Sequence, residues 1–543
     1  MSRSVPPPPV AGRSSGDRSL LNSSPIWVAG ILLAAVLAFA PSLGNDWVYD
    51  DAVVVLRHPA VLGGSLIGAL VAPFWPPGTT ADKLYRPLTT ASYHLEVASS
   101  GDRLPDAART HVVNLLLHAA TSVGVFLLAG AAGLPAAAAG FAGVLFAVHP
   151  VHTEAVVTGY GRAELLAGMA GALLLWLALR VPAERRGWRH VAVLTTLFLV
   201  AVMSKEHGLL LWPALLVFDL TGRGRLPDST RPSRGAWINQ TLPRTHVGFA
   251  VAATVFLLLR WSVLGGAFRL PDAVMRPWED PFAGATALTR GLTALRLLWL
   301  TGRVLVLPGA LCPVWSYPAL APATVVAGDV LAGAVLACAW AFGVVIGLRR
   351  GSGSAAIAAA LVPLIWIVLH LPPAPHWAFA ERWLYLPSVL ITVLVAVPLR
   401  HLRSLGSFVL AALIAALLIP STRAYARVFA SDLTLTRAAV SRQPNGFHGV
   451  RNLALVQLNR RSWGDALATG RVLESRFGPT VDSDWVILNA SLGAGDRTAA
   501  EAALASLRRR LQGQDSPLLQ DLARRIAALP LATARSPDAT PDR

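Results

Sequence analysis

Two adjacent carboxylates, Asp50 and Asp51, have the clearest potential for chemistry in this sequence. They follow the first long apolar run, Ile26 to Leu43, and so would lie just beyond a membrane surface. A carboxylate placed there can act as a general base, and two adjacent acids raise each other's pKa toward the useful range. The alternative is that both acids merely solvate the end of a helix.

Four further polar clusters each lie beside an apolar run. They are His149, His152 and Glu154; Arg162 and Glu164; Lys205 and Glu206; and Glu381 and Arg382. Ionisable groups are costly near lipid and tend to mark a pathway or a site. The expected topology places all four clusters on the same side as the acidic pair, which predicts one shared site.

Each cluster also has a simpler explanation. His149, His152 and Glu154 could bind a metal ion, but Pro150 disrupts a regular helical pair and favours a hydrogen-bonding role. We therefore predict no metal ligands; a divalent metal is possible but not required by the sequence, and the cofactor is unknown.

The remaining candidates have two roles open to them. Arg162 and Glu164 stand two positions apart on a helix, so they point in different directions and contact either substrate or a neighbouring helix. Lys205 and Glu206 could bind substrate or form an ion pair with each other. The same two roles are open to Glu381 and Arg382. Tyr85 and Arg86 could line an acceptor groove or anchor their loop at the lipid headgroups.

The composition is that of a membrane protein. The chain has 543 residues, of which 54% are hydrophobic and 14% charged, and its mean hydropathy is +0.53. Many apolar runs are long enough for transmembrane helices. The net charge of +17 comes from arginines in loops, where they set topology and meet anionic lipid, so we expect no nucleic-acid partner. Cys312 and Cys338 lie in apolar surroundings and support neither a disulfide framework nor a zinc site.

The sequence predicts an all-α polytopic fold with about eleven transmembrane helices. We predict a disordered cytoplasmic tail for residues 1–24 and a membrane domain for residues 25–420, with residues 45–110 as its long outer loop. The predicted spans cover about 26–43, 111–130, 136–149, 156–180, 190–203, 207–220, 246–264, 325–347, 355–371, 384–399 and 406–420. Arginine clusters between alternate spans satisfy the positive-inside rule only if residues 288–307 do not cross.

Residues 288–307 should therefore form an amphipathic or re-entrant helix on the outer face. On a regular helix Arg296 and Arg303 project within roughly 20° of each other. We predict that they bind an anionic group of the substrate at this surface, with Arg260 as the competing candidate. The alternative is that these arginines extend toward lipid headgroups.

Residues 421–530 predict a short extracytoplasmic domain of tetratricopeptide-like helical pairs. Leu453 and Ile487 stand 34 positions apart, which is the period of that repeat. Two repeats are few for independent stability, so the domain should dock on the membrane domain. Residues 531–543 read as a disordered tail.

Several of these motifs resemble those of the transmembrane and tetratricopeptide-repeat-containing O-mannosyltransferases. The shared runs, in the same order, are Tyr49-Asp50-Asp51, Tyr85-Arg86-Pro87-Leu88, the residues 111–118, the residues 149–156, Gly161-Arg162-Ala163-Glu164, Ser204-Lys205-Glu206 and the residues 381–388. The resemblance covers about residues 25–420. It implies a C-type glycosyltransferase fold, transfer on the non-cytoplasmic face, and mannose or a similar hexose delivered to a hydroxyl acceptor such as Ser or Thr of a protein. It also implies a polyprenyl-phosphate sugar donor, and the lipid phosphate is then the anionic group expected at Arg296 and Arg303, or at Arg260.

The chain departs from this family in two places. Family members often carry an acidic residue before the tryptophan of the segment that reads Cys312-Pro313-Val314-Trp315-Ser316 here. The repeat array is also shorter than in eukaryotic relatives. Both departures bear on the acceptor.

Two other classes remain open from sequence: a transporter or flippase, and a non-catalytic envelope scaffold with partner-binding repeats. A transporter predicts an internal repeat and broken helices near the midplane, which the sequence does not show. The Ala- and Arg-rich composition is typical of GC-rich bacteria. We therefore expect a bacterial inner or plasma membrane, with the active site and the repeats on the periplasmic or extracellular side.

Overall fold

The computed structural model describes residues 23–77, 84–101, 104–181, 183–221, 242–265, 285–366, 368–369, 379–511 and 517–529. The predicted tails, 1–24 and 531–543, fall almost wholly outside these residues. So does the arginine-rich stretch 222–241. Within the described residues the regular elements are helices, joined by two isolated antiparallel bridges, Trp315 with Phe379 and Pro318 with Gly446.

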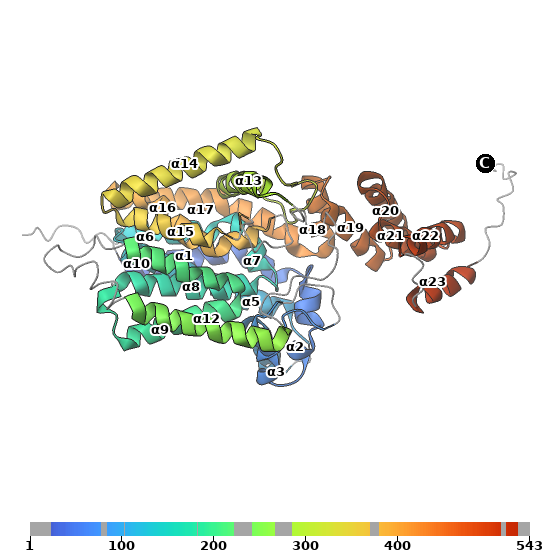
Figure 1. Ribbon diagram of the computed structural model, residues 1–543, viewed down its shortest axis with the longest axis horizontal. Helices are drawn as coiled ribbons and strands as arrows, with labels where there is room; N and C mark the ends of the chain where they lie inside the picture. Colours follow the sequence, from blue (N-terminus) through green and yellow to red (C-terminus); the bar gives the residue numbers. More distant parts are fainter. Residues whose placement is uncertain are drawn as a thin grey trace, which may run out of the picture.

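A bundle of long helices forms the larger lobe (Figure 1). Its helices are α1 (Ser24–Phe39), α5 (Ala107–Ala131), α6 (Ala136–Val148), α8 (Arg162–Arg180), α9 (Trp188–Ser204), α10 (Leu211–Thr221), α12 (Leu242–Leu264), α14 (Gly328–Arg349), α15 (Gly353–Leu364), α16 (Tyr385–Ala396) and α17 (Ser404–Ala426). The shorter elements are η2 (Ala40–Gly44), η3 (Ala52–Leu56), α2 (Pro59–Leu62), α3 (Leu66–Leu70), α4 (Pro87–Ser100), η4 (Pro150–His152), α7 (Thr153–Val157), η5 (Ala183–Arg185), η6 (Glu206–Leu210), η9 (Pro308–Ala310), η10 (Glu381–Leu384), η11 (Val397–His401) and η12 (Arg427–Ala430).

The protein is an integral membrane protein, because seven described helices are long and apolar enough to cross a bilayer. An eighth crossing results if α6 and the bent segment that follows it, Pro150–Val157, act as one span. Each of the eleven predicted spans is occupied by a helix, but α9, α10 and α15 have only 17, 11 and 12 residues. The all-α polytopic prediction is confirmed, and the number of crossings stays a prediction.

Helix α8 lies at the centre of the bundle and α14 at its edge. Within their most apolar windows, 72% of residues are buried in α8 but only 11% in α14, so α14 faces the lipid. Helix α1 packs closely on α6, since a Cβ at Gly140 would lie 2.1 Å from the Trp27 ring. This contact fixes the N-terminal part of α1, and the acidic pair follows the other end of the same helix.

Helix α13 (Ala287–Val306) runs across the direction of the bundle. Figure 1 shows α13 end-on, whereas α14, α16 and α17 run roughly horizontally across the picture, and α13 is not among the described helices long and apolar enough to cross. Its apolar residues Leu297, Leu298 and Val304 are buried. That residues 288–307 do not cross the membrane stays a prediction.

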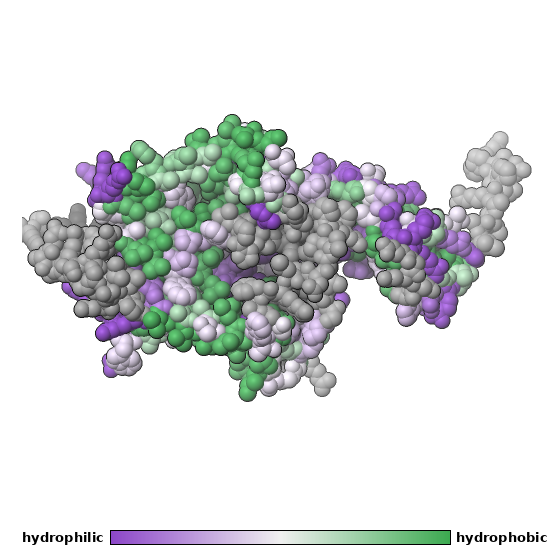
Figure 2. All heavy atoms as spheres, viewed as in Figure 1, coloured by the Kyte–Doolittle hydropathy of each residue, from purple (hydrophilic) through white to green (hydrophobic). Residues whose placement is uncertain are grey.

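The smaller lobe is a row of helical hairpins: α18 (Asp432–Arg442), α19 (Phe447–Asn459), α20 (Trp463–Phe477), α21 (Val481–Ala494), α22 (Arg497–Arg510) and α23 (Pro517–Ala527). Figure 2 shows hydrophobic residues over the larger lobe and many hydrophilic residues over this one. In Figure 1, α2, α3, α7 and α18 gather at the same end of the bundle, where the two lobes meet.

Candidate active site

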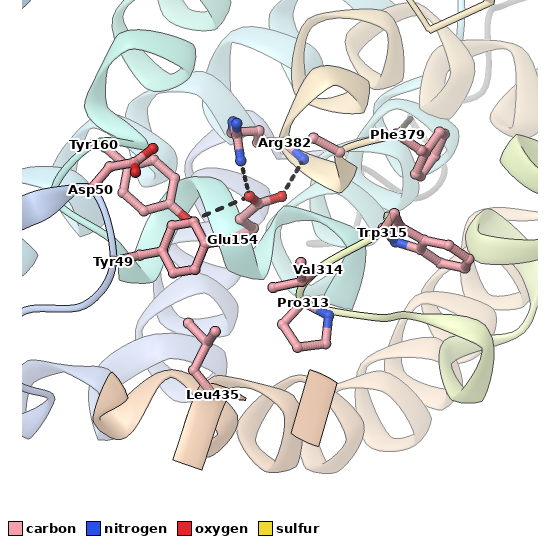
Figure 3. A pocket seen from close by; sticks show the side chains of 11 residues that line it. Tyr49, Asp50, Glu154, Tyr160, Pro313, Val314, Trp315, Phe379, Arg382 and Leu435 are labelled. Carbon is pink, nitrogen blue, oxygen red and sulfur yellow. Dashed lines mark hydrogen bonds and ion pairs between the residues drawn. The ribbon is translucent and has the colours of Figure 1, made fainter. Parts of the chain in front are cut away.

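A pocket opens at this end of the bundle, where Asp50, Glu154 and Arg382 meet Leu435 of the smaller lobe (Figure 3). Its lining residues are Tyr49, Asp50, Glu154, Tyr160, Pro313, Val314, Trp315, Phe379, Ala380, Arg382 and Leu435. The cavity volume is about 20 Å³, enough for a group the size of water or a hydroxyl. The pocket therefore joins polar groups to an aromatic wall in a space suited to one reacting group.

Asp50 borders this pocket from the turn after α1. Burial raises the pKa of its carboxyl from 3.8 to about 6; the nearby Glu154 also raises the pKa, while Arg382 and Arg86 lower it. Burial thus contributes more than the neighbouring acid that the sequence analysis invoked. A carboxyl with this pKa is ionised at neutral pH and still basic enough to accept a proton.

Asp51 is oriented differently and is fully buried. Its Oδ2 accepts the backbone N–H of Val48 at 3.1 Å, and its Oδ1 accepts that of Tyr160 at 2.7 Å. A Cβ at Gly159 would lie 2.8 Å from Oδ1, so the neighbouring chain can approach this closely only with glycine. Asp51 therefore joins the turn after α1 to the loop before α8. Of the two predicted acids, Asp50 faces the pocket and Asp51 supports the backbone around it.

Glu154 and Arg382 form an ion pair across the pocket. The guanidinium of Arg382 donates to Oε1 of Glu154, and the backbone N–H of Arg382 donates to Oε2 at 3.0 Å. Tyr160 donates its hydroxyl to the same carboxylate at 3.3 Å, and the guanidinium lies 5.2 Å from the Tyr160 ring centroid. Residues from α7 and η10 are thereby fixed beside Asp50.

Glu381 turns away from Arg382 and is buried. Its Oε1 accepts the N–H of Cys312 at 2.6 Å and the indole N–H of Trp315 at 3.2 Å, while Oε2 accepts the hydroxyl of Tyr425 at 2.8 Å. This carboxylate holds the segment that carries Pro313 and Trp315 against α17. The expected pairing of Glu381 with its sequence neighbour is therefore wrong.

Arg162 and Glu164 bond to different partners, as their spacing predicts. Arg162 is fully buried; it pairs with Glu96 at 2.7 Å and donates to Asn114 Oδ1 at 2.9 Å. Glu164 pairs with Lys205, and both are buried. These contacts join α8 to α4, α5 and the segment after α9.

Glu206 lies between two arginines rather than pairing with Lys205. It is 3.0 Å from Arg86 and 3.7 Å from Arg260, so the pairing expected of Lys205 and Glu206 is also wrong. Arg86 further lies 4.6 Å from the Phe74 ring centroid. Glu206 thus brings the guanidinium groups of Arg86 and Arg260 together.

Tyr85 and the two histidines bind other parts of the protein. Tyr85 donates its hydroxyl to the carbonyl of Leu70 at 2.8 Å. His149 lies 2.9 Å from the carbonyl of Leu305 at the end of α13, and His152 lies 2.8 Å from the hydroxyl of Ser388. Within the described ranges no three His, Cys, Asp or Glu side chains are grouped closely enough to hold a metal ion.

The arginines of α13 lie in different surroundings. Arg296 is 2.8 Å from the carboxylate of Asp329 and donates to the carbonyl of Ala321 at 2.8 Å. Arg303 is exposed. The structure thus gives Arg296 an anionic partner from the start of α14, and it does not join the two arginines in one pocket.

Three contributors to the pocket were not expected from sequence. Tyr160 and Phe379 flank predicted motifs, and their aromatic character was the one available signal. Leu435 lines the pocket from α18, in the smaller lobe. Sequence reasoning had no signal for this residue, because the domain was expected only to dock somewhere on the bundle.

Comparison with known proteins identifies relatives of this chain. No family model matches it. The protein O-mannosyl-transferase TMTC4 of Mus musculus is 28% identical over 470 residues, covering 77% of this chain and 62% of the relative. TMTC3 of Homo sapiens is 28% identical over 65% of the chain and 40% of the relative, and F38B6.6 of Caenorhabditis elegans, also a protein O-mannosyl-transferase, is 28% identical over 73% and 53%.

Among solved structures, the Archaeoglobus fulgidus oligosaccharyltransferase with a tethered acceptor peptide aligns over 75% of this chain and 55% of its own. The TM-score is 0.41 and the sequence identity 13%. The chain spans about three-fifths or less of the length of these curated relatives. The resemblance expected from the motifs is confirmed over most of the sequence: the chain is a homologue of the TMTC protein O-mannosyltransferases.

Proposed function

We propose that this protein is a membrane glycosyltransferase of the C-type that moves a sugar, mannose or a similar hexose, from a polyprenyl-phosphate carrier to a hydroxyl acceptor such as Ser or Thr of a protein. The observation that carries the proposal is the position of Asp50. It borders a pocket beside the Glu154–Arg382 ion pair, with a pKa of about 6. The homologues support transfer of mannose to protein.

In the proposed reaction Asp50 is the general base. The acceptor O–H proton passes to its carboxylate as the acceptor oxygen bonds to the anomeric carbon of the sugar. The bond between that carbon and the phosphate oxygen breaks, and the lipid phosphate leaves with the electron pair. Arg382, held by Glu154, lies where it can orient the sugar or stabilise the leaving oxygen.

Arg86 and Arg260 are the residues best placed to bind the carrier phosphate. Glu206 holds these two cations together, and Arg86 is close enough to Asp50 to lower its pKa. Arg296 already has the carboxylate of Asp329 as a partner. Among the predicted candidates the proposal therefore moves from α13 to Arg260, with Arg86 beside it.

Transfer can be measured with purified protein, a radiolabelled polyprenyl-phosphate mannose and a Ser/Thr-containing peptide. Asp50→Asn should lower the rate by about 100-fold or more, the usual contribution of a positioned base. The matched control is Asp465→Asn, because Asp465 is exposed on α20. It should keep the wild-type rate.

Wild-type activity in Asp50→Asn would remove this residue as the base. The other two classes are distinguished in the same preparation. Movement of labelled lipid across proteoliposomes without any transfer would identify a flippase. Binding of envelope proteins with neither activity would identify a scaffold.

A further inference from the structure

The turn that presents Asp50 has an unusual backbone. The N–H of Asp51 bonds to the carbonyl of Val48 at 3.1 Å, so Tyr49 and Asp50 are the central residues of a four-residue turn. Tyr49 has φ +58°, in the left-handed region. A positive φ at the first central position is normally supplied by glycine, and a bulky side chain there needs other contacts to hold it.

Those contacts come from the first hairpin of the smaller lobe. Asp432, in the first turn of α18, accepts the backbone N–H of Tyr49 at 2.7 Å through Oδ1. Asn452 of α19 donates its side-chain amide to the Tyr49 hydroxyl. The backbone and the side chain of Tyr49 are thus held by two different helices, next to the proposed base.

The same hairpin is attached to the other wall of the pocket. Gln443 accepts the N–H of Ser316 at 3.3 Å, Phe447 donates its N–H to Tyr317 at 3.0 Å, and Arg442 donates to the carbonyl of Leu311. Leu435, one turn beyond Asp432, lines the pocket itself, and Figure 3 shows it on α18 beneath Tyr49. The hairpin therefore connects the Asp50 turn with the segment that carries Pro313 and Trp315.

We propose that α18 and α19 belong to the active site, where Asp432 and Asn452 act as positioning residues that hold Tyr49 and thereby aim Asp50 at the acceptor hydroxyl. This inference rests on the proposed function. In this arrangement the repeat domain does more than recruit an acceptor: its first hairpin completes the catalytic centre.

Charge gives Asp432 a second effect. The groups that act on Asp50 are Arg382 from η10, Glu154 from α7, Arg86 before α4 and Asp432 from α18. The two carboxylates raise the pKa of Asp50 and the two arginines lower it. Removing the charge of Asp432 while keeping a hydrogen-bond acceptor should therefore lower the pKa of Asp50.

Two kinds of substitution separate position from charge. Asp432→Asn keeps an acceptor oxygen, so it should retain most of the rate and move the acidic limb of the pH–rate profile to lower pH. Asp432→Ala and Asn452→Ala lose the contacts, and each should lower kcat by about tenfold or more with a smaller effect on the donor KM, because small misplacements are costly. Asn459→Ala, an exposed position on α19, is the matched control.

The pair of Tyr49 and Asn452 gives an internal check. Tyr49→Phe removes the hydroxyl partner, so it should cost about as much as Asn452→Ala, and the double variant should cost no more than either. Additive losses would show that the two side chains act separately and would overturn the assigned contact.

Hydrogen exchange makes the test independent of activity. Amides of residues 48–54 should exchange several-fold faster in Asp432→Ala and Asn452→Ala than in the wild type or Asn459→Ala. Unchanged exchange together with unchanged kcat in both variants would overturn the proposal. If the wild type transfers no sugar, the proposed function fails, and the exchange rates alone then decide whether the hairpin orders this turn.

Discussion

At the scale of single residues, two neighbouring aspartates have different environments because they stand at different positions of one turn. Asp51 closes the turn and accepts backbone N–H groups from Val48 and Tyr160. Asp50, at a central position, projects toward the pocket. Chemistry is assigned to Asp50 because its carboxylate is not already enclosed by backbone donors.

The pH dependence of transfer follows from the same residue. The base form of Asp50 is the ionised carboxylate, and its pKa is about 6. The rate should therefore be level at neutral pH and fall about tenfold for each pH unit below about 6, as the carboxylate becomes protonated. Initial rates at saturating donor, measured across this range, provide the check.

In Asp50→Asn the residual rate should lose this acidic limb. An unchanged limb in that variant would assign the titration to another group. An acidic limb near the ordinary carboxyl pKa of 3.8 would show that Asp50 is not buried in the active protein.

At the scale of elements, α13 separates what a helical pattern can and cannot predict. Its helical form could be anticipated from its apolar and basic residues, while its exclusion from the crossing count stays a prediction. The partner of Arg296 could not, because Asp329 lies beyond a long loop at the start of α14. The prediction that Arg296 binds the carrier phosphate assumed that no carboxylate already paired with this arginine.

Substitution of the cationic residues decides between the two positions for the phosphate. Arg86→Ala and Arg260→Ala should each lower transfer about tenfold or more, since charge-assisted hydrogen bonds are the strong ones, and lysine should replace either residue only in part. Arg303→Ala should leave transfer unchanged, because that side chain is exposed on α13. Rates measured over a range of donor concentrations test this.

The opposite pattern would assign phosphate binding to the arginines of α13. It would consist of a large loss in Arg296→Ala or Arg303→Ala, with wild-type rates in the Arg86 and Arg260 variants. Arg86→Ala also exposes Glu206, so Glu206→Gln should be prepared in parallel. A gain or no change in Glu206→Gln would show that the lost arginine, and not the freed carboxylate, causes the effect.

Sequence reasoning succeeded where the pattern is local and failed where partners are remote. Apolar runs and arginine loops predicted a helix for each of the eleven spans, and the period of 34 residues predicted the hairpins. The expected ion pairs between chain neighbours, Lys205 with Glu206 and Glu381 with Arg382, were wrong because buried charges find partners on other helices. Leu435 and Asp432 could not be predicted, since their place depends on how one lobe docks on the other.

At the scale of the whole molecule, the arginine-rich helix ends lie opposite the pocket. Helices α8, α14 and α16 each follow a segment that contributes residues to the pocket. At their other ends, α8 and α14 finish at Arg180 and Arg349, and Arg400 follows α16 in η11. A helix of such length separates its two ends by most of a bilayer. This segregation supports the proposal that the pocket faces the non-cytoplasmic side.

Cysteine labelling tests that orientation with two glycines that have open space for a side chain. Gly464, in the smaller lobe, and Gly187, between α8 and α9, both have no atom within 4 Å of an added Cβ. In a Cys338→Ala background, which removes the exposed native thiol, Gly464→Cys should react with an impermeant maleimide in intact spheroplasts. Gly187→Cys should react only after permeabilisation.

Labelling of Gly187→Cys with protection of Gly464→Cys in intact cells would invert the orientation and place the pocket in the cytoplasm. Equal labelling of both before permeabilisation would indicate leaky spheroplasts. A cytoplasmic protein probed in the same sample excludes that outcome.

The docking of α18 and α19 on the Asp50 turn has a consequence for biogenesis. The two residues of the Tyr49–Asp432 contact stand 383 positions apart in the chain. A ribosome delivers the turn early and the hairpin only after the last predicted span. During synthesis the helices of the bundle can insert and pack while the catalytic turn still lacks its support. Until the hairpin emerges, the nascent protein would therefore transfer sugar about tenfold or more slowly than the finished enzyme.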